Sequence, residues 1–176
     1  MQEPIRYNPY DRTGSCAVEG KSAEERFIQY AQSKGWNAIR GTTQQNMFEH
    51  WDVMINKDDK SYRVDVKGKK RVNRNDTHTL DDKVWIELDG FKKIKSWLYG
   101  KADLIAFETT DKFTLIPRLK LIQLVDKLVD KTAYVQKAKD ALYKVYARHY
   151  VMGTVSSIEE SDKVTMIKLS DIEGAC

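Results

Sequence analysis

The chain has 176 residues, a length that suits one domain with a buried core. Hydrophobic residues make up 41% and charged residues 32% of the sequence, and no apolar run approaches membrane-spanning length, which excludes a membrane-spanning chain. The formal net charge is only +4, but Lys and Arg crowd into "KGKKRVNR", "GFKKIKSWLYGK" and "YVQKAKDALYKVYARH". This clustering indicates a polyanionic partner, with ordinary solvation as the alternative.

The first part of the chain predicts one helix followed by three strands. Residues 1–20 are expected to form an irregular arm that contains two prolines and two glycines. Ser22 and Glu25 have the spacing of a capping box, an apolar stripe follows at helical spacing, and Gly35 is expected to end the helix. Strands are predicted at 36–41, 50–55 and 62–68, and a polar turn joins the last two into a hairpin.

The second part predicts further strands and one more helix. Apolar residues recur at helical spacing over 118–135, which predicts an amphipathic helix, whereas 141–151 fits a strand or a helix equally well. Residues 69–82 are expected to be a charged loop, and 156–164 a polar loop. Strands are expected at 83–90, 102–110, 112–117 and 164–172. The fold class predicted is α/β, one domain over residues 1–176 with helices on a central mixed sheet.

The cysteines and histidines do not predict a metal site. Cys16 and Cys176 lie near opposite ends, and the three histidines share no ligand spacing. Free thiols in a reducing compartment are the simplest account. The first residues lack the apolar core of a signal peptide, so we expect a soluble cytoplasmic protein.

Two acids and a lysine on the predicted hairpin are the best candidates for a site. Side chains two apart on a strand point to the same face, so Asp65 and Lys67 should share a face. Asp52 lies on the neighbouring strand, and hairpin strands are about 5 Å apart, so both carboxylates can converge on one cation. Such oxygen ligands suit Mg²⁺ or Mn²⁺, the carbonyl of Val66 is a candidate further ligand, and Lys67 can address a phosphate or water. The chemistry expected is phosphodiester hydrolysis.

The order of a helix Glu, an Asp and then Asp-x-Lys resembles the PD-(D/E)xK nuclease superfamily, with "WD" in place of "PD". The residues that carry the resemblance are Glu24, Asp52, Asp65 and Lys67, within roughly residues 20–70. The later part is similar, more loosely, to phage-type endonucleases and Holliday junction resolvases. The resemblance implies a restriction-endonuclease-like core, Mg²⁺ as the metal with Mn²⁺ as a substitute, DNA that includes branched forms as substrate, and a homodimer.

Two glutamates compete for the helix position of that set. Glu25 is expected to turn back toward the amide of Ser22 in the capping box. Glu24 shares a helix face with Phe27 and Ile28, and that face should pack on the sheet. Glu24 is therefore the better candidate metal ligand.

Several of these acids have simpler interpretations that the sequence leaves open. Asp52 fits a solvent-facing acid at a hairpin edge, and Asp65 with Lys67 fits a solvated stripe. Glu87 fits a surface residue better than one that assists a metal, and Asp103 fits the start of a strand.

The basic stretches are expected to bind nucleic acid. Trp97 and Tyr99 lie among lysines and suit such contact, although burial is the commoner fate of a tryptophan. The candidate phosphate-binding residues are Lys69, Lys70, Arg71, Arg74, Lys92, Lys93 and Lys95.

The function expected is a metal-dependent DNA endonuclease. A catalytically inactive module that binds nucleic acid or protein on the same fold is the alternative, and an RNA-processing enzyme is a third. The complete set of two acids and a lysine favours the enzyme.

Overall fold

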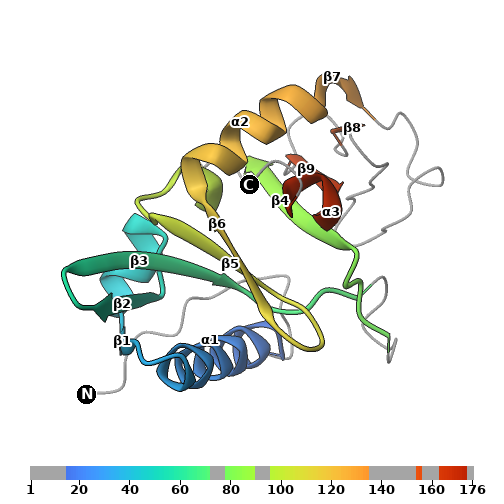
Figure 1. Cartoon of the computed structure of the whole chain (residues 1–176). Helices are drawn as coiled ribbons and strands as arrows, with labels where there is room; N and C mark the ends of the chain where they lie inside the picture. Colours follow the sequence, from blue (N-terminus) through green and yellow to red (C-terminus); the bar gives the residue numbers. More distant parts are fainter. Residues whose placement is uncertain (1–14, 72–77, 90–95, 135–153, 156–162, 174–176) are drawn as a thin grey trace.

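The computed structural model describes residues 15–71, 78–89, 96–134, 154–155 and 163–173. It confirms an α/β fold built on a mixed five-stranded sheet in the order β1-β2-β3-β5-β6 (Figure 1). Its elements are α1 Ser15–Ser33, β1 Asn37–Arg40, η1 Gln45–Glu49, β2 Val53–Lys57, β3 Lys60–Lys67, β4 Lys83–Asp89, η3 Trp97–Tyr99, β5 Leu104–Glu108, β6 Phe113–Pro117, α2 Arg118–Leu128, β7 Asp130–Tyr134, β8 Thr154–Val155, β9 Lys163–Lys168 and α3 Leu169–Glu173.

Helix α1 begins earlier than the capping-box pattern predicts. Residues 15–20 are helical and do not belong to an irregular arm, while 1–14 lie outside the described residues. Ser22 is inside the helix, where its hydroxyl donates to the carbonyl of Val18, so the predicted capping box with Glu25 is wrong. Gly35 ends the helix as predicted, with a φ of 78° that a residue with a side chain rarely adopts.

The three predicted strands after α1 are confirmed as an antiparallel unit. Strand β1 pairs with β2, and β2 pairs with β3 in a hairpin whose register places Val53 opposite Val64. Asp58 has a φ of 52° in the turn of that hairpin. Strand β3 then pairs with β5 in parallel, and β5 pairs with β6 antiparallel, which makes the sheet mixed.

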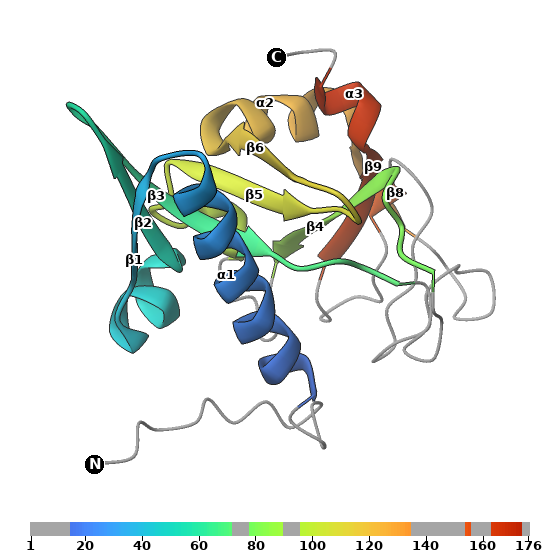
Figure 2. The same ribbon diagram turned by 60° about the horizontal axis from the view of Figure 1, so that its bottom comes forward.

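The two faces of the sheet contact different parts of the chain. On one face, Val53 and Val64 pack with Phe27 of α1 in one hydrophobic cluster. On the other face, Ile105 packs with side chains of β4, η3, α2 and α3, among them Leu121. Figure 2 shows α1 on one side of the sheet and α2 and α3 on the other. The sheet is therefore covered on both faces.

The structure corrects three predictions for the second half of the chain. Strand β4 pairs with β9 in a separate two-stranded sheet. The helix predicted over 118–135 ends at Leu128, and residues 130–134 form β7, where Thr132 is β-branched. The expected final strand divides into β9 and α3. Residues 141–151 lie outside the described residues, as do most of 156–164.

None of the helices in the described part of the chain combines the length and the apolar character needed to cross a membrane.

Candidate active site

Asp52, Asp65 and Lys67 lie on one face of the sheet. Val64 and Val66 alternate with Asp65 and Lys67 on β3, and the two valines are buried against α1, so the acid and the lysine face the opposite side. Asp52 immediately precedes β2, whose Val53 also packs toward α1. Asp52 is 8% exposed and Asp65 only 3%, so the alternative interpretation of solvated acids is wrong for both.

Asp52 is held by hydrogen bonds on both carboxylate oxygens. Its Oδ2 accepts a 2.7 Å hydrogen bond from the backbone N–H of Val66, and its Oδ1 accepts one from Nδ2 of Asn46. The backbone N–H of Asp52 donates to the carbonyl of Val64 at 2.9 Å. These contacts fix the carboxylate of Asp52 next to β3, at Val66, which lies between Asp65 and Lys67.

Asp65 lacks comparable hydrogen bonding. Its Oδ2 is buried and accepts no hydrogen bond from any residue that the structure describes, although the Nζ of Lys67 lies 2.9 Å away. That distance makes an ion pair. Burial raises the pKa of Asp65 well above its ordinary value, Lys67 opposes this, and the nearby carboxylate of Asp52 raises the pKa further. A buried oxygen in this state is a ready acceptor for a cation.

Lys67 is held in place by two groups at once. Besides its ion pair with Asp65, the Nζ of Lys67 lies 4.4 Å from the centroid of the Trp97 ring, a cation–π distance. Trp97 is 8% exposed and packs in the core, in edge-to-face contact with Phe107. The packing interpretation of Trp97 is thus confirmed, and through it the core orients Lys67.

The third predicted acid is not brought to this pair. Glu24 lies on α1, which packs on the other face of the sheet, and its carboxylate pairs with Arg40. Arg40 also pairs with Glu25 at 3.1 Å, so both helix acids share one arginine. No three His, Cys, Asp or Glu side chains among the described residues are grouped so that they could hold a metal. A role for Glu24 as a third ligand stays a prediction.

The donor set nevertheless suits a divalent metal. Two carboxylates of adjacent strands, one with an oxygen that accepts no hydrogen bond within the described structure, are the hard oxygen ligands that Mg²⁺ and Mn²⁺ prefer. Mg²⁺ usually keeps several waters and needs only one or two protein carboxylates, so two acids are enough. The residues present therefore fit such a metal.

A further acid, Glu108, supports the end of β3 and has no counterpart in the sequence prediction. Its carboxylate accepts from Arg26 at 2.5 and 2.9 Å and from the backbone N–H of Lys69 at 3.3 Å. A Cβ on Gly68 would lie 3.1 Å from the Cβ of Ala23, so α1 packs closely on this turn. Glu108 is buried, and its partner Arg26 is 82 positions away in sequence, a separation that local patterns do not reveal.

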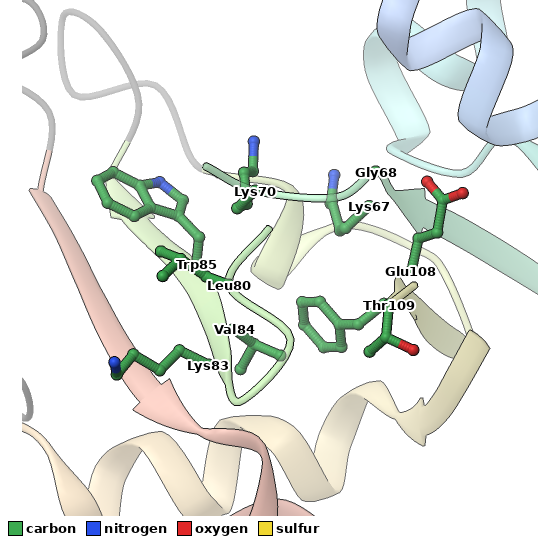
Figure 3. A pocket seen from close by; sticks show the side chains of 10 residues that line it. Lys67, Gly68, Lys70, Leu80, Lys83, Val84, Trp85, Glu108 and Thr109 are labelled. Atoms are coloured by element: carbon green, nitrogen blue, oxygen red, sulfur yellow. The ribbon is translucent and has the colours of Figure 1, made fainter. Parts of the chain in front are cut away.

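A depression beside Lys67 is lined by basic, apolar and acidic side chains (Figure 3). Lys70, Lys83 and Trp85 line it, and Glu108 lies on its other side. Of the predicted phosphate-binding residues, Lys69 is half-buried, and Lys70 and Arg71 are exposed. The predictions for Arg74, Lys92, Lys93 and Lys95 lie outside the described residues.

The other residues considered in the sequence lie outside the pair of buried acids. Asp103 precedes β5, where its carboxylate accepts from the backbone N–H and the guanidinium of Arg63, and these bonds hold its pKa below the ordinary value. Glu87 is half-buried on β4, which belongs to the separate two-stranded sheet. Tyr99 is 39% exposed. Asp103 thus has the predicted place at a strand start.

The sequence matches no protein-family model and no curated protein. A solved structure of a bacterial homing endonuclease, I-Ssp6803I, is similar to this chain with a TM-score of 0.44 and 15% sequence identity. The similarity covers 62% of this chain and 74% of the homing endonuclease chain. A likeness of this size carries no argument about activity, which has to be inferred from the residues of the site.

Proposed function

We propose that this protein is a metal-dependent endonuclease that hydrolyses phosphodiester bonds in DNA. The observation that carries the proposal is the arrangement of Asp65 and Asp52. The carboxylates of Asp52, just before β2, and of Asp65, on β3, are both buried, and the lysine of the Asp-x-Lys pattern pairs with Asp65. Oδ2 of Asp65 accepts no hydrogen bond within the described structure. Burying two carboxylates is unfavourable unless cations compensate both charges, and Lys67 compensates only one of them.

Asp52 and Asp65 would hold Mg²⁺, with the carbonyl of Val66 as a candidate further ligand. The metal, when bound, would make water a stronger nucleophile and offset negative charge on the phosphate. The two acids have different parts in binding it. Asp52 is already oriented by Val66 and Asn46, whereas burial raises the pKa of Asp65, so that a bound cation would favour its ionised form.

Lys67 would act on the phosphate or on the attacking water. Its ammonium group now neutralises Asp65 at 2.9 Å and lies against Trp97. With a cation held by Asp65, Lys67 would be free of that ion pair, while Trp97 would still limit where it can point. A positively charged donor at this place stabilises the negative charge that builds up on the phosphate oxygens.

A cleavage assay tests the proposal. Purified protein is incubated with Mg²⁺ or Mn²⁺ and with linear duplex, single-stranded, flapped and four-way-junction DNA, and with RNA of matched sequence. We expect metal-dependent cleavage of DNA, abolished by EDTA and by Asp52→Asn and Asp65→Asn. Asp171→Asn, which changes an exposed acid on α3, is the matched control and should cleave as the parent does.

The same assay also tests the preferred substrate and the two alternative functions. The resemblance to Holliday junction resolvases leads us to propose branched or otherwise structured DNA as the preferred substrate. Cleavage of RNA in preference to DNA would support an RNA-processing enzyme. Binding of DNA with no cleavage under any of these conditions would support the inactive binding module.

A further inference from the structure

Lys67 has two partners in the structure, and the proposed chemistry would take one of them away. Its Nζ lies 2.9 Å from Oδ2 of Asp65 and 4.4 Å from the centroid of the Trp97 ring. If Asp65 bound a metal ion, its carboxylate would no longer neutralise Lys67, and the like charges of ion and ammonium group would repel each other. Of the two contacts, the one with Trp97 would then remain to keep Lys67 in place.

The register of the sheet brings Lys67 next to the packing partner of Trp97. Lys67 on β3 pairs with Phe107 on β5, and residues that pair directly across two strands point to the same face. The Trp97 ring contacts both of them, since it also meets Phe107 edge to face with the centroids 6.2 Å apart. Trp97 is buried and the Lys67 side chain is 21% exposed, so little solvent reaches this contact. A cation–π interaction is stronger where water is excluded.

The turn that carries Trp97 is fixed from two directions. Ser96, buried directly before η3, donates from its hydroxyl to the carbonyl of Glu87 on β4 and accepts from the backbone N–H of Leu98 at 3.2 Å. From α2, the guanidinium of Arg118 donates to the carbonyl of Leu98 at 3.3 Å. The separate two-stranded sheet and α2 therefore both hold η3 in position beside β3.

The aromatic ring offers Lys67 what a further acid could not. An aromatic face attracts an ammonium group but supplies no oxygen ligand, so it would not take the metal from Asp52 and Asp65. It also accepts no directed hydrogen bond from the lysine. The three N–H groups of Lys67 would then be available to phosphate oxygens or to water.

On these grounds, which rest on the proposed function, we propose that Trp97 is a positioning residue whose ring face holds the ammonium group of Lys67 toward the phosphate when Asp65 binds the metal. The competing explanation is that Trp97 only packs in the core, where it belongs to the same hydrophobic cluster as Phe107.

Fluorinated tryptophans at position 97 test this without removing the ring. Each added fluorine withdraws electron density from the ring face and weakens its attraction for a cation, while the shape of the side chain changes little. The full-length protein is made with one to four fluorines on Trp97, and cleavage of DNA is measured in Mg²⁺. We expect kcat to fall with each fluorine, by about 10-fold over the series, and KM to stay unchanged, because the contact acts in the chemical step.

Two controls separate positioning from packing. The same fluorine series at Trp36, which packs against Tyr62 on the α1 side of the sheet, should leave kcat unchanged. In Lys67→Ala, the Trp97 series should leave the residual single-turnover cleavage rate unchanged, because the ring acts only through Lys67. An unchanged kcat across the Trp97 series, or an equal fall in Lys67→Ala, would overturn the inference while cleavage by the parent still supported the nuclease.

The NMR signal of the Cε methylene group of Lys67, assigned by comparison with Lys67→Arg, gives a readout that needs no activity. Protons above an aromatic face resonate upfield, and we expect this shift both in the metal-free protein and in Mg²⁺. Loss of the shift on addition of Mg²⁺ would overturn the inference, because the ring would not hold Lys67 in the metal-bound state. Absence of metal-dependent cleavage by the parent would overturn the proposed function, and the inference with it.

Discussion

The backbone N–H of Val66 donates a 2.7 Å hydrogen bond to Oδ2 of Asp52, so the residue between Asp65 and Lys67 binds the other acid of the site. This bond ties the two strands together through a side chain at the point where β2 begins. A slip of β3 by one residue would turn Asp65 and Lys67 to the α1 face. Register and site geometry therefore depend on the same contact.

The buried Asp65 should make metal-free stability depend on pH. Burial raises its folded-state pKa well above 3.8, with Lys67 opposing and Asp52 adding to the shift. The folded protein then holds the proton more tightly than the unfolded chain. The stabilisation that Asp65 contributes is therefore complete below its unfolded-state pKa. It is lost as the pH rises from that value to the raised folded-state pKa.

Urea denaturation in EDTA checks this across a pH series. The free energy of unfolding of Asp65→Asn should exceed that of the parent by a margin that grows with pH, to about 1 kcal/mol near neutral pH. Asp171→Asn should follow the parent at every pH. Parallel curves for Asp65→Asn and the parent would show that Asp65 keeps an ordinary pKa.

Lys67→Ala should lose most cleavage activity but keep metal affinity. Lys67 neutralises Asp65 at 2.9 Å in the metal-free protein, so it competes with a cation for that carboxylate and does not bind the cation itself. Calorimetric titration with Mn²⁺ should give an affinity equal to that of the parent or higher. Lys127→Ala on α2 is the control for loss of a lysine, and a large loss of Mn²⁺ affinity in Lys67→Ala would refute the assignment.

Glu24→Gln should impair cleavage more than Glu25→Gln does. The side chain of Glu24 is 16% exposed and that of Glu25 is 57% exposed, although both pair with Arg40. The predicted role of Glu24 as a third ligand requires about a 10-fold loss of activity, or more, for Glu24→Gln, although α1 carries Glu24 on the other face of the sheet from Asp52 and Asp65. Because Glu25 has no capping role, Glu25→Gln should change stability by less than about 0.5 kcal/mol. The opposite ranking in steady-state assays would remove Glu24 from the site.

The basic turn after β3 should contribute to DNA affinity without reading sequence. Replacing Lys69, Lys70 and Arg71 with Ala should weaken binding of unrelated DNA sequences equally, because interactions with phosphate carry no base information. The slope of log affinity against log salt should become shallower by about 0.9 for each phosphate that the variant no longer neutralises. Fluorescence anisotropy at several salt concentrations measures both effects, and an unchanged slope would show that these residues only solvate the turn.

The sequence predicts the hairpin and its acidic face well because strand alternation is a local property. Val64 and Val66 had to face opposite to Asp65 and Lys67, and they do. The start of α1 was missed because Ser22 and Glu25 show a capping pattern inside a helix whose first turns carry no apolar stripe. No local sequence pattern around Glu108 predicts its ion pair with Arg26, because that pair forms only when α1 packs over the end of β3.

The most direct test of the account is the binding of Mn²⁺ to the metal-free protein, measured by calorimetry and by electron paramagnetic resonance of the free ion. We predict binding that depends on both acids, so that Asp52→Asn and Asp65→Asn each lose it, whereas Asp171→Asn, changed on the exposed surface of α3, retains the affinity of the parent. Binding should also weaken as the pH falls, because Asp65 must be deprotonated to take the ion. Unchanged Mn²⁺ affinity in both Asp52→Asn and Asp65→Asn would contradict the central claim that these two buried carboxylates form the metal site.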